Sequence, residues 1–404
     1  MNNTIKLAVA SALLAAASSA NAGISIPAGD WTLDIGGVVN AYYTSTSFSG
    51  DDAGAGEYKN GDTVNNITTG LLPNVLAVSG KTRQNDLDVG FTIAINPGAA
   101  QTKSASGGSA SEHRQAFLTF GDKSWGSIKA GKDLGIYASD AILNDMTLLG
   151  VGSAAGNGVS TTTLGRIGTG YMYADWKSQI AYSSPNWNGF SFTAGVTQGW
   201  NAWGDGFAYD SSAASAERSG SAPAFEGKVS YEWAGDVSGK VWASAISQKV
   251  EGLDVAAGQS DNDRANAWDI GATVNVAGFG LTGYYGQGKG IGQTFQLLDG
   301  FDHGGKRRDS DQWYVQGTYT LPGVGTKLGV SYGKSTLEGN NPSSDHGFDE
   351  LEDSMWTVGA YHPLTKHLNL VAEYSETQRE LKYDGSPRAE AEAKTVSLGA
   401  ILFF

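Results

Sequence analysis

The stretch TVSLGAILFF, from Thr395 to Phe404, is an alternating apolar strand at the end of the chain. Apolar residues recur at every second position, so that one face of the strand carries Val396, Leu398, Ala400, Leu402 and Phe404. The last residues of soluble domains usually fray, because they gain little from burial. An apolar strand in this position predicts that the end of the chain is held by pairing along its length.

The beginning of the chain has the pattern of an export signal. Met1 to Lys6 is positively charged, Leu7 to Ala17 is apolar, and Ala20-Asn21-Ala22 is a small-x-small cleavage site. The apolar part is too short to span a bilayer, which takes about 20 apolar residues. We therefore expect residues 1–22 to be a signal peptide and residues 23–404 to be the mature protein. Removing the single charge of Lys6 would change the formal net charge from −14 to −15.

The composition argues against membrane-spanning helices and favours strands. The hydrophobic fraction is 40% and the mean hydropathy is −0.25. After residue 22 no stretch approaches about 18 consecutive apolar residues. A membrane-spanning strand needs only about 9 to 11 residues, and only every second one must be apolar if the other face lines water. The isoelectric point near 4.7 disfavours nucleic-acid binding, because an acidic surface repels phosphates.

Alternating segments recur through the whole chain, beginning with WTLDIGGVVNAYY at Trp31 to Tyr43. Short connections rich in Gly, Pro, Asn and Asp lie at residues 84–86, 121–124, 185–188, 235–236, 277–278, 321–325 and 362–366. Long connections lie at residues 47–73, 97–111, 133–165, 199–223, 251–264, 288–309, 335–350 and 378–391. Seven turns and eight loops would join sixteen strands.

This arrangement predicts an all-β fold, a 16-stranded antiparallel transmembrane β-barrel with short turns at one rim and long loops at the other. In hydrocarbon every backbone donor and acceptor must be paired, so the sheet must close. The last strand should therefore pair with the first, Trp31 to Ser45, and present its apolar row to lipid. Aromatic residues near strand ends would mark the membrane interfaces, namely Trp31, Tyr42, Tyr43, Trp125, Trp187, Trp233, Trp268, Trp313, Trp356 and Tyr361. A barrel of this size encloses an aqueous lumen.

Two stretches resemble the general trimeric porins of Gram-negative bacteria. HRQAFLTFGDKSWGSIKAGKDLGIYASDAILNDM, His113 to Met146, is similar to the fourth and fifth strands and the third loop of that family. WKSQIAYSSPNWNGFSF, Trp176 to Phe192, is similar to its hairpin of the sixth and seventh strands. The resemblance implies a homotrimeric outer-membrane porin for passive diffusion of ions and small hydrophilic solutes. It also implies that the third loop, residues 133–165, folds inward and constricts the pore.

The resemblance further implies which residues form the constriction. In the family, carboxylates of the third loop face a cluster of basic wall residues, and the field between them orients polar solutes and penalises apolar ones. Arg114 matches the family's wall arginine, and Arg166 matches the arginine that opens the next strand. If Phe117 and Ile167 face lipid, alternation points both arginines into the lumen.

A lysine of the fifth strand is a further basic candidate. Lys132 matches a basic position of the family, but alternation turns it outward together with Ile128 and Ala130. The same alternation makes Lys129 the inward residue. A bulge in the strand would be needed for Lys132 to reach the lumen, so the sequence leaves both lysines as candidates.

The third loop carries the acidic candidates. Asp145 matches an acidic position of the family, and Asp140 lies a turn earlier. Where many members of the family continue Pro-Glu-Phe-Gly-Gly, this chain has Leu148, Leu149 and Gly150, so a central carboxylate is missing. We therefore expect a less acidic constriction than the family pattern.

Other function classes have little support. The chain has five scattered histidines and no Gly-x-Ser-x-Gly, phosphate loop or paired metal-ligand motif, so we expect no enzyme, cofactor or metal site. Surplus acidic residues lie mostly in predicted loops, where they are either solvated or bridged by divalent cations at the cell surface. A solute-specific channel, and a surface adhesion or structural barrel with a blocked lumen, remain as alternatives.

Overall fold

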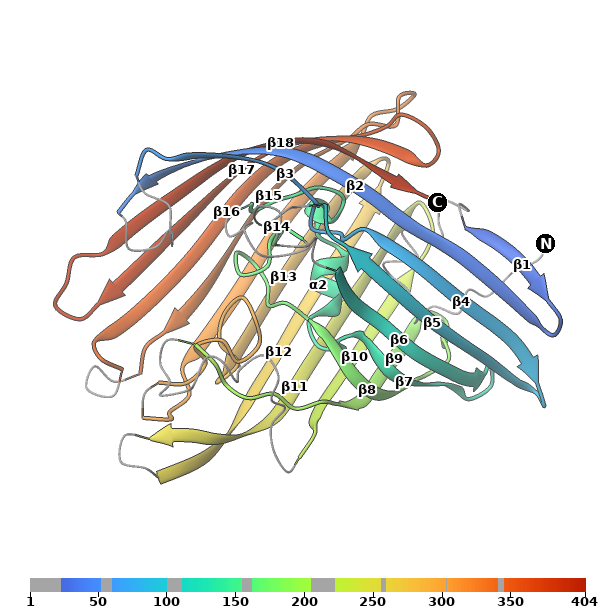
Figure 1. Ribbon diagram of the computed structural model, residues 1–404, viewed down its shortest axis with the longest axis horizontal. Coiled ribbons are helices and arrows are strands. Elements are labelled where there is room, and N and C mark those ends of the chain that lie inside the picture. The colour runs from blue at the N-terminus through green and yellow to red at the C-terminus, as the bar shows by residue number, and fades with distance from the viewer. Residues whose placement is uncertain are drawn as a thin grey trace.

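A computed structural model describes residues 23–51, 60–99, 111–154, 162–204, 222–255, 259–302, 304–340 and 345–404, and the expected signal peptide lies outside these ranges. Its strands form one closed sheet (Figure 1). The first half contains β1 (Ile24–Ala28), β2 (Trp31–Gly50), β3 (Thr63–Thr68), β4 (Val75–Gln84), β5 (Leu87–Pro97), β6 (Ser111–Asp122), β7 (Gly126–Leu134), β8 (Trp176–Ser183) and β9 (Phe190–Thr197). The second half contains β10 (Ala224–Trp233), β11 (Val237–Val255), β12 (Gln259–Val276), β13 (Phe279–Lys289), β14 (Asp309–Thr320), β15 (Lys327–Glu338), β16 (Phe348–Pro363), β17 (Leu368–Tyr383) and β18 (Ala389–Phe403).

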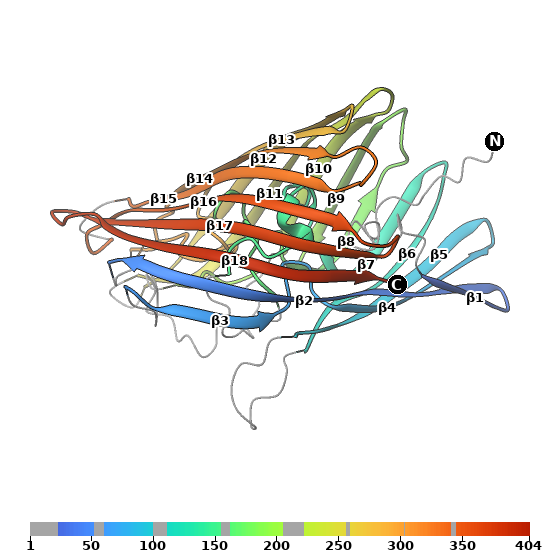
Figure 2. The ribbon, with the colours of Figure 1, turned by 90° about the horizontal axis from the view of Figure 1, so that it is seen from above.

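The two ends of the chain close the barrel. β18 pairs antiparallel with β2, from Ala391 opposite Gly50 to Phe403 opposite Val38, and the two strands lie side by side in Figure 2. This pairing confirms the expectation that the last strand is held by the first. The apolar row of β18 faces outward, and Leu398 is 52% exposed. A membrane would cover this row, because hydrocarbon is the surrounding in which exposed apolar side chains are stable.

The N-terminal strand β1 was not predicted from the sequence. It pairs with β2 from Trp31 to Ile35, along the edge of β2 that β18 occupies further on. Between the two, the backbones of Phe404 and Gly37 exchange hydrogen bonds of 2.8 and 3.1 Å. β1 therefore continues the line of β18 and pairs the part of β2 that β18 does not reach.

The second strand of the barrel is interrupted. β3 and β4 both pair with β2, one along each half, and residues 69–74 between them leave the sheet. This interruption buries Leu71 and Leu72. With β3 and β4 counted as one strand, and β1 as an extension of β18, the barrel has the sixteen strands that the alternation predicts.

Several strands are longer than predicted. The predicted loop at residues 251–264 is mostly strand, because β11 and β12 extend through it, and β17 and β18 shorten the loop predicted at 378–391 in the same way. The extensions are polar, and Asp263 of β12 forms an ion pair of 3.2 Å with Arg307 of the connection between β13 and β14. The polar residues show that these strand ends are exposed to water. They do not show that the backbone is irregular there.

An aromatic row runs around the outside of β12 to β17. Trp313 and Tyr332 have ring centroids 5.6 Å apart, and Trp356 and Tyr374 are 5.1 Å apart. The strand registers join these pairs to Trp268 and Tyr285. Aromatic rings prefer the headgroup level of a bilayer, so this row marks one membrane interface.

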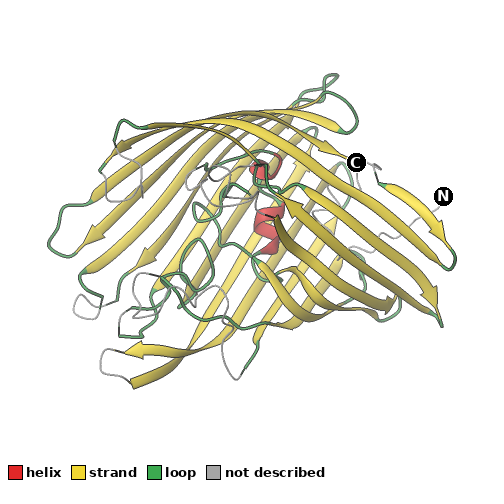
Figure 3. Ribbon diagram, in the orientation of Figure 1, coloured by secondary structure: helices red, strands yellow, loops and turns green. Residues whose placement is uncertain are grey.

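The short helical elements are α2 (Ser139–Leu143) and the 3-10 helix η2 (Met146–Leu149), both between β7 and β8. Figure 3 shows them in red inside the ring of strands. In the part of the chain that the structure describes, no helix combines the length and the apolar character needed to cross a membrane.

Candidate functional site

The connection between β7 and β8, residues 135–175 and here called L3, lies inside the barrel (Figures 1 and 3). Its described parts are residues 135–154 and 162–175. The Asp145 side chain caps η2 by accepting a hydrogen bond of 2.9 Å from the backbone N–H of Thr147. L3 is longer than the predicted 133–165, because β8 begins only at Trp176.

One wall of the barrel holds the start of L3 through a buried carboxylate. Glu226 of β10 accepts hydrogen bonds of 2.8 Å from the backbone N–H groups of both Ile136 and Tyr137. Its other oxygen accepts from Lys177 Nζ at 2.5 Å, and both side chains of this ion pair are fully buried. Removing one partner of such a buried ion pair strongly destabilises the fold, because the other charge stays buried without a counter-ion.

The opposite wall holds the middle of L3 in the same manner. Glu373 of β17 accepts hydrogen bonds from the backbone N–H groups of Val151 at 2.7 Å and Gly152 at 2.9 Å. It also accepts from the Tyr361 hydroxyl at 2.6 Å. Because β10 and β17 lie on different sides of the ring, these two carboxylates stretch L3 across the lumen.

Asp140 of α2 is anchored to two wall lysines. Its carboxylate accepts hydrogen bonds from Lys240 Nζ at 2.6 Å and Lys228 Nζ at 3.1 Å. Burial favours the neutral acid, but the two ammonium groups outweigh it and lower the pKa of Asp140 below 3.8. The carboxylate is therefore ionised at neutral pH and its charge is compensated by the wall.

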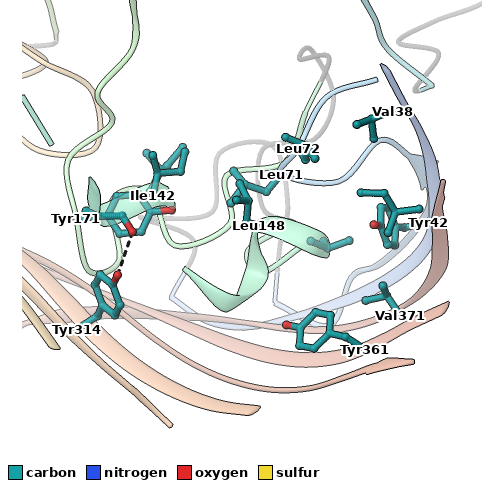
Figure 4. Close-up of a cluster of buried hydrophobic side chains, with 14 of the residues drawn as sticks. Val38, Tyr42, Leu71, Leu72, Ile142, Leu148, Tyr171, Tyr314, Tyr361 and Val371 are labelled. Carbon is teal, nitrogen blue, oxygen red and sulfur yellow. Dashed lines mark hydrogen bonds between the residues drawn. The ribbon is translucent and has the colours of Figure 1, made fainter. Parts of the chain in front are cut away.

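An apolar cluster fills part of the interior around L3 (Figure 4). Leu148 packs there with Leu71 and Leu72 from the interruption between β3 and β4. Tyr42 and Tyr361, which were predicted at the membrane interface, face inward in the same cluster and are buried. The prediction was wrong for these two tyrosines, since closeness to a strand end does not determine which face a residue occupies.

Two cavities lie inside the barrel on either side of L3. The loop-side cavity measures about 230 Å³ and the turn-side cavity about 600 Å³. Leu143 and Leu148 line both cavities, so these two side chains separate them. The loop-side cavity is also lined by Arg114 and Asp175, and the turn-side cavity by Lys327. The barrel interior is therefore divided into two cavities by the apolar side chains of Leu143 and Leu148.

A family model described as Gram-negative porin matches residues 8–380 of the sequence. The chain belongs to the Gram-negative porin family. The porin is therefore a channel of the outer membrane for passive diffusion of solutes. A comparison with the sequences of curated proteins gives no significant match.

Solved structures of outer-membrane proteins share the fold of this porin. The outer-membrane channel DcaP of Acinetobacter baumannii has a TM-score of 0.65 and 15% identity, over 95% of this chain and all of that one. OmpF of Salmonella typhi has a TM-score of 0.57 and 16% identity, over 93% of this chain and all of that one. OmpT of Vibrio cholerae has a TM-score of 0.55 and 13% identity, over 94% of this chain and 99% of that one. At these identities the likeness concerns the fold alone.

Arg114 of the porin lines the loop-side cavity, as predicted for an inward residue. The prediction rested on simple alternation with Phe117, and this reason was wrong. Phe117 faces the interior and is 6% exposed, whereas alternation had placed it against lipid. The register between β5 and β6 shifts beside Arg114, so that this residue and Gln115 are both buried. The Arg114 Nε donates to Glu112 at 2.7 Å. A bulge is the feature that the alternation could not show.

Arg166 of the porin lies within L3 and does not open the next strand. Its side chain is fully buried, and its Nη1 donates to the backbone oxygen of Met355 at 2.8 Å. Burial lowers the pKa of this guanidinium, although Asp145 nearby opposes the change. Ile167, expected against lipid, is also buried inside. Arg166 lines neither of the two cavities.

The two lysines of β7 point in opposite directions. Lys129 faces the interior, where it forms an ion pair with Asp133 and lies 5.0 Å from the Phe117 ring centroid. Lys132 falls on the opposite, outward row of β7, in register with Ala116 of β6. The simple alternation was therefore right for this strand, and the structure places Lys132 away from the lumen.

The wall anchors and the apolar division were missed by the sequence reasoning. Glu226 and Glu373 are acidic residues on inward rows of strands, a signal that was available but is shared with many lumen residues. In the sequence, Leu148 indicated only that a carboxylate of the family pattern is missing. Of the five histidines, His303 lies outside the described residues, and in the described ranges no group of three or more potential metal ligands occurs.

Proposed function

We propose that small solutes cross this porin through the two cavities on either side of L3, passing the side chains of Leu143 and Leu148. The observation that supports the route is that both cavities are lined by the same two leucines inside one closed barrel. Purified protein in planar bilayers should give stepwise, ohmic conductance. Bilayers that stay closed at high protein concentration would contradict a conducting channel.

We propose Arg114 as the basic residue that solutes meet at the constriction, with Glu112 and Asp175 as its acidic neighbours. All three line the loop-side cavity. In this proposal Asp145 is an acidic residue of the turn-side cavity, which it lines. Asp140, Lys129 and Arg166 contribute indirectly, since their partners lie in the wall or within L3. Passage through the channel requires neither an enzymatic site nor a cofactor.

The porin is proposed to be a homotrimer that contacts itself through β3 to β6. The strongly exposed large apolar residues of these strands are all aliphatic, namely Ile67, Leu76, Val78, Ile93, Ile95 and Leu118. The aromatic row of β12 to β17 has no counterpart among them. An aliphatic surface suits protein packing, whereas aromatic rows suit a lipid interface. The double variant Leu76→Arg/Ile93→Arg should lower the oligomer mass in detergent, and Val315→Arg on the aromatic side should not.

We also propose that export removes residues 1–22. The charged start, apolar core and Ala-Asn-Ala site support this cleavage. Sequencing the N-terminus of protein isolated from outer membranes should begin at Gly23. A start at Met1 would contradict it.

A barrel with a blocked lumen is the second candidate, because the apolar cluster around L3 fills much of the constriction. In that case the loops would bind a partner and no solute would pass. The bilayer measurement above separates the two, since a blocked barrel gives no conductance steps.

A further inference from the structure

Two Leu-Leu pairs from distant parts of the sequence meet inside the barrel. Leu71 and Leu72 come from the break between β3 and β4, and Leu148 and Leu149 come from η2 of L3. The N–H of Leu71 donates to the backbone oxygen of Gly150 at 2.9 Å. This backbone hydrogen bond joins the two segments beside the leucines.

Most charged residues of L3 bind the wall or other parts of L3, and two of them, Asp145 and Asp175, also line the turn-side and the loop-side cavity respectively. Asp140 is bound to two lysines of the wall, and the Asp145 carboxylate accepts hydrogen bonds from Thr147 and from the Tyr171 hydroxyl at 2.8 Å. The guanidinium of Arg166 donates to the wall backbone. Asp140 and Arg166 are engaged in holding L3, and Leu143 and Leu148 are the two residues that line both cavities.

An apolar passage opposes ions and favours apolar groups. A small ion must lose part of its water shell between Leu143 and Leu148, because these two side chains offer it no charge, and a narrow apolar segment also loses its own water. A solute with an apolar side group loses little water at the same point and gains contact with the leucines. The selectivity is the reverse of that expected for a charged constriction.

Opposite charges line the loop-side cavity next to this passage. The guanidinium of Arg114 lines it, and so do the carboxylates of Glu112 and Asp175, of which Glu112 accepts a hydrogen bond of 2.7 Å from Arg114 Nε. A carboxylate of a solute fits the guanidinium, and an ammonium group fits the carboxylates. The same cavity is bordered by Leu143 and Leu148.

We propose that Leu143 and Leu148 form an apolar barrier that makes this porin selective for small zwitterions with an apolar side group, over ions and over equally small zwitterions with a polar side group. The inference rests on the proposed function, because it names the solute class of that same passage. Leucine and asparagine are suitable probes, since they have similar size and the same charged groups.

Swelling of liposomes that contain the porin tests the proposal. Leucine should enter about threefold faster than asparagine, in keeping with the transfer free energy of part of one apolar side chain. In Leu148→Asn, which keeps the branching and the number of non-hydrogen atoms of the side chain, this ratio should fall toward one. The potassium chloride conductance should rise about fivefold in the same variant. Leu143→Asn should change the entry ratio and the conductance in the same way, and it replaces Leu148→Asn in the test if that variant does not fold.

Val371→Thr is the matched control, because Val371 belongs to the same buried cluster but lines neither cavity. It should change neither the ratio nor the conductance. Equal entry of leucine and asparagine into wild-type liposomes, or an unchanged ratio in both asparagine variants, would overturn the barrier while the channel function stands. If neither wild type nor variants pass any solute, the channel function itself fails and the barrier with it.

Discussion

The two faces of L3 differ in the kind of side chain they present. The face toward the wall is polar and charged, and Asp140, the backbone at Ile136 and the backbone at Val151 all find partners on strands. The face toward the cavities presents Leu143 and Leu148 where the two cavities meet, with Asp145 on the turn side and Asp175 on the loop side. Charged groups near a pore can therefore serve to position a loop, and the residues a solute meets can be different ones.

Removing a wall anchor should produce the largest effect. Glu226→Gln keeps the shape of the side chain but leaves Lys177 charged and buried without its counter-ion. We expect a loss of about 3 to 5 kcal/mol in the free energy of unfolding, measured by denaturant unfolding in detergent micelles.

A double variant sharpens this test. Glu226→Gln combined with Lys177→Met removes the uncompensated charge and should recover part of the lost stability. If Glu226→Gln alone unfolds like the wild type, the anchor has no energetic role, and the contrast between the two faces of L3 disappears.

The two arginines should behave differently when neutralised. Arg114→Met removes a positive charge that lines the loop-side cavity, so the permeability ratio of cations to anions should rise about threefold. Arg166→Met removes a charge that lines neither cavity and should leave this ratio unchanged. Reversal potentials under a salt gradient measure both. Equal shifts for the two variants would place Arg166 at the passage.

Neutralising the acidic anchor should shift selectivity in the opposite direction. Asp140→Asn leaves Lys228 without its counter-ion and Lys240 with Glu232 as its remaining partner. We expect about a twofold shift toward anions together with a loss of about 1 to 2 kcal/mol in stability. Reversal potential and thermal unfolding give the two values. Asp236→Asn is the control for stability: this residue lines the turn-side cavity and does not bind Lys228 or Lys240, so its thermal unfolding should match that of the wild type.

The smallest effect is the pH dependence of the same anchor. Because the pKa of folded Asp140 lies below its ordinary value of 3.8, ionisation of this group stabilises the fold fully above that value. The contribution is lost as the pH falls through the folded pKa. Thermal unfolding between pH 6 and about pH 3 should show this loss in the wild type. Asp140→Asn should lack it, and an identical pH profile in both proteins would contradict the assignment.

The fold could be predicted because its signals are local. Every strand of a barrel alternates between lipid and interior, and this alternation is visible in β18 and β2 without any knowledge of their partners. The predictions failed at three kinds of place. The bulge beside Arg114 shifts the alternation by one residue, the break between β3 and β4 turns Leu71 inward, and the polar ends of β11 and β12 continue as strand.

The candidate site could be predicted only in part, since it depends on a loop that folds back. The sequence located L3 and the inward direction of Lys129, and the resemblance supplied Arg114, Asp140 and Asp145. Nothing local connects Asp140 with its two lysines on β10 and β11, or Glu373 with the backbone of L3.

The sequence by itself determined the barrel, its strand number and its closure, because apolar alternation and turn residues act between neighbours along the chain. Only the tertiary structure decided which charges hold L3 and which side chains line the passage. The closed sheet brings together charged residues that are far apart in the sequence, such as Glu226 and Lys177, and these pairs are buried. A solute contacts the side chains that line the cavities, which depend on where those pairs form.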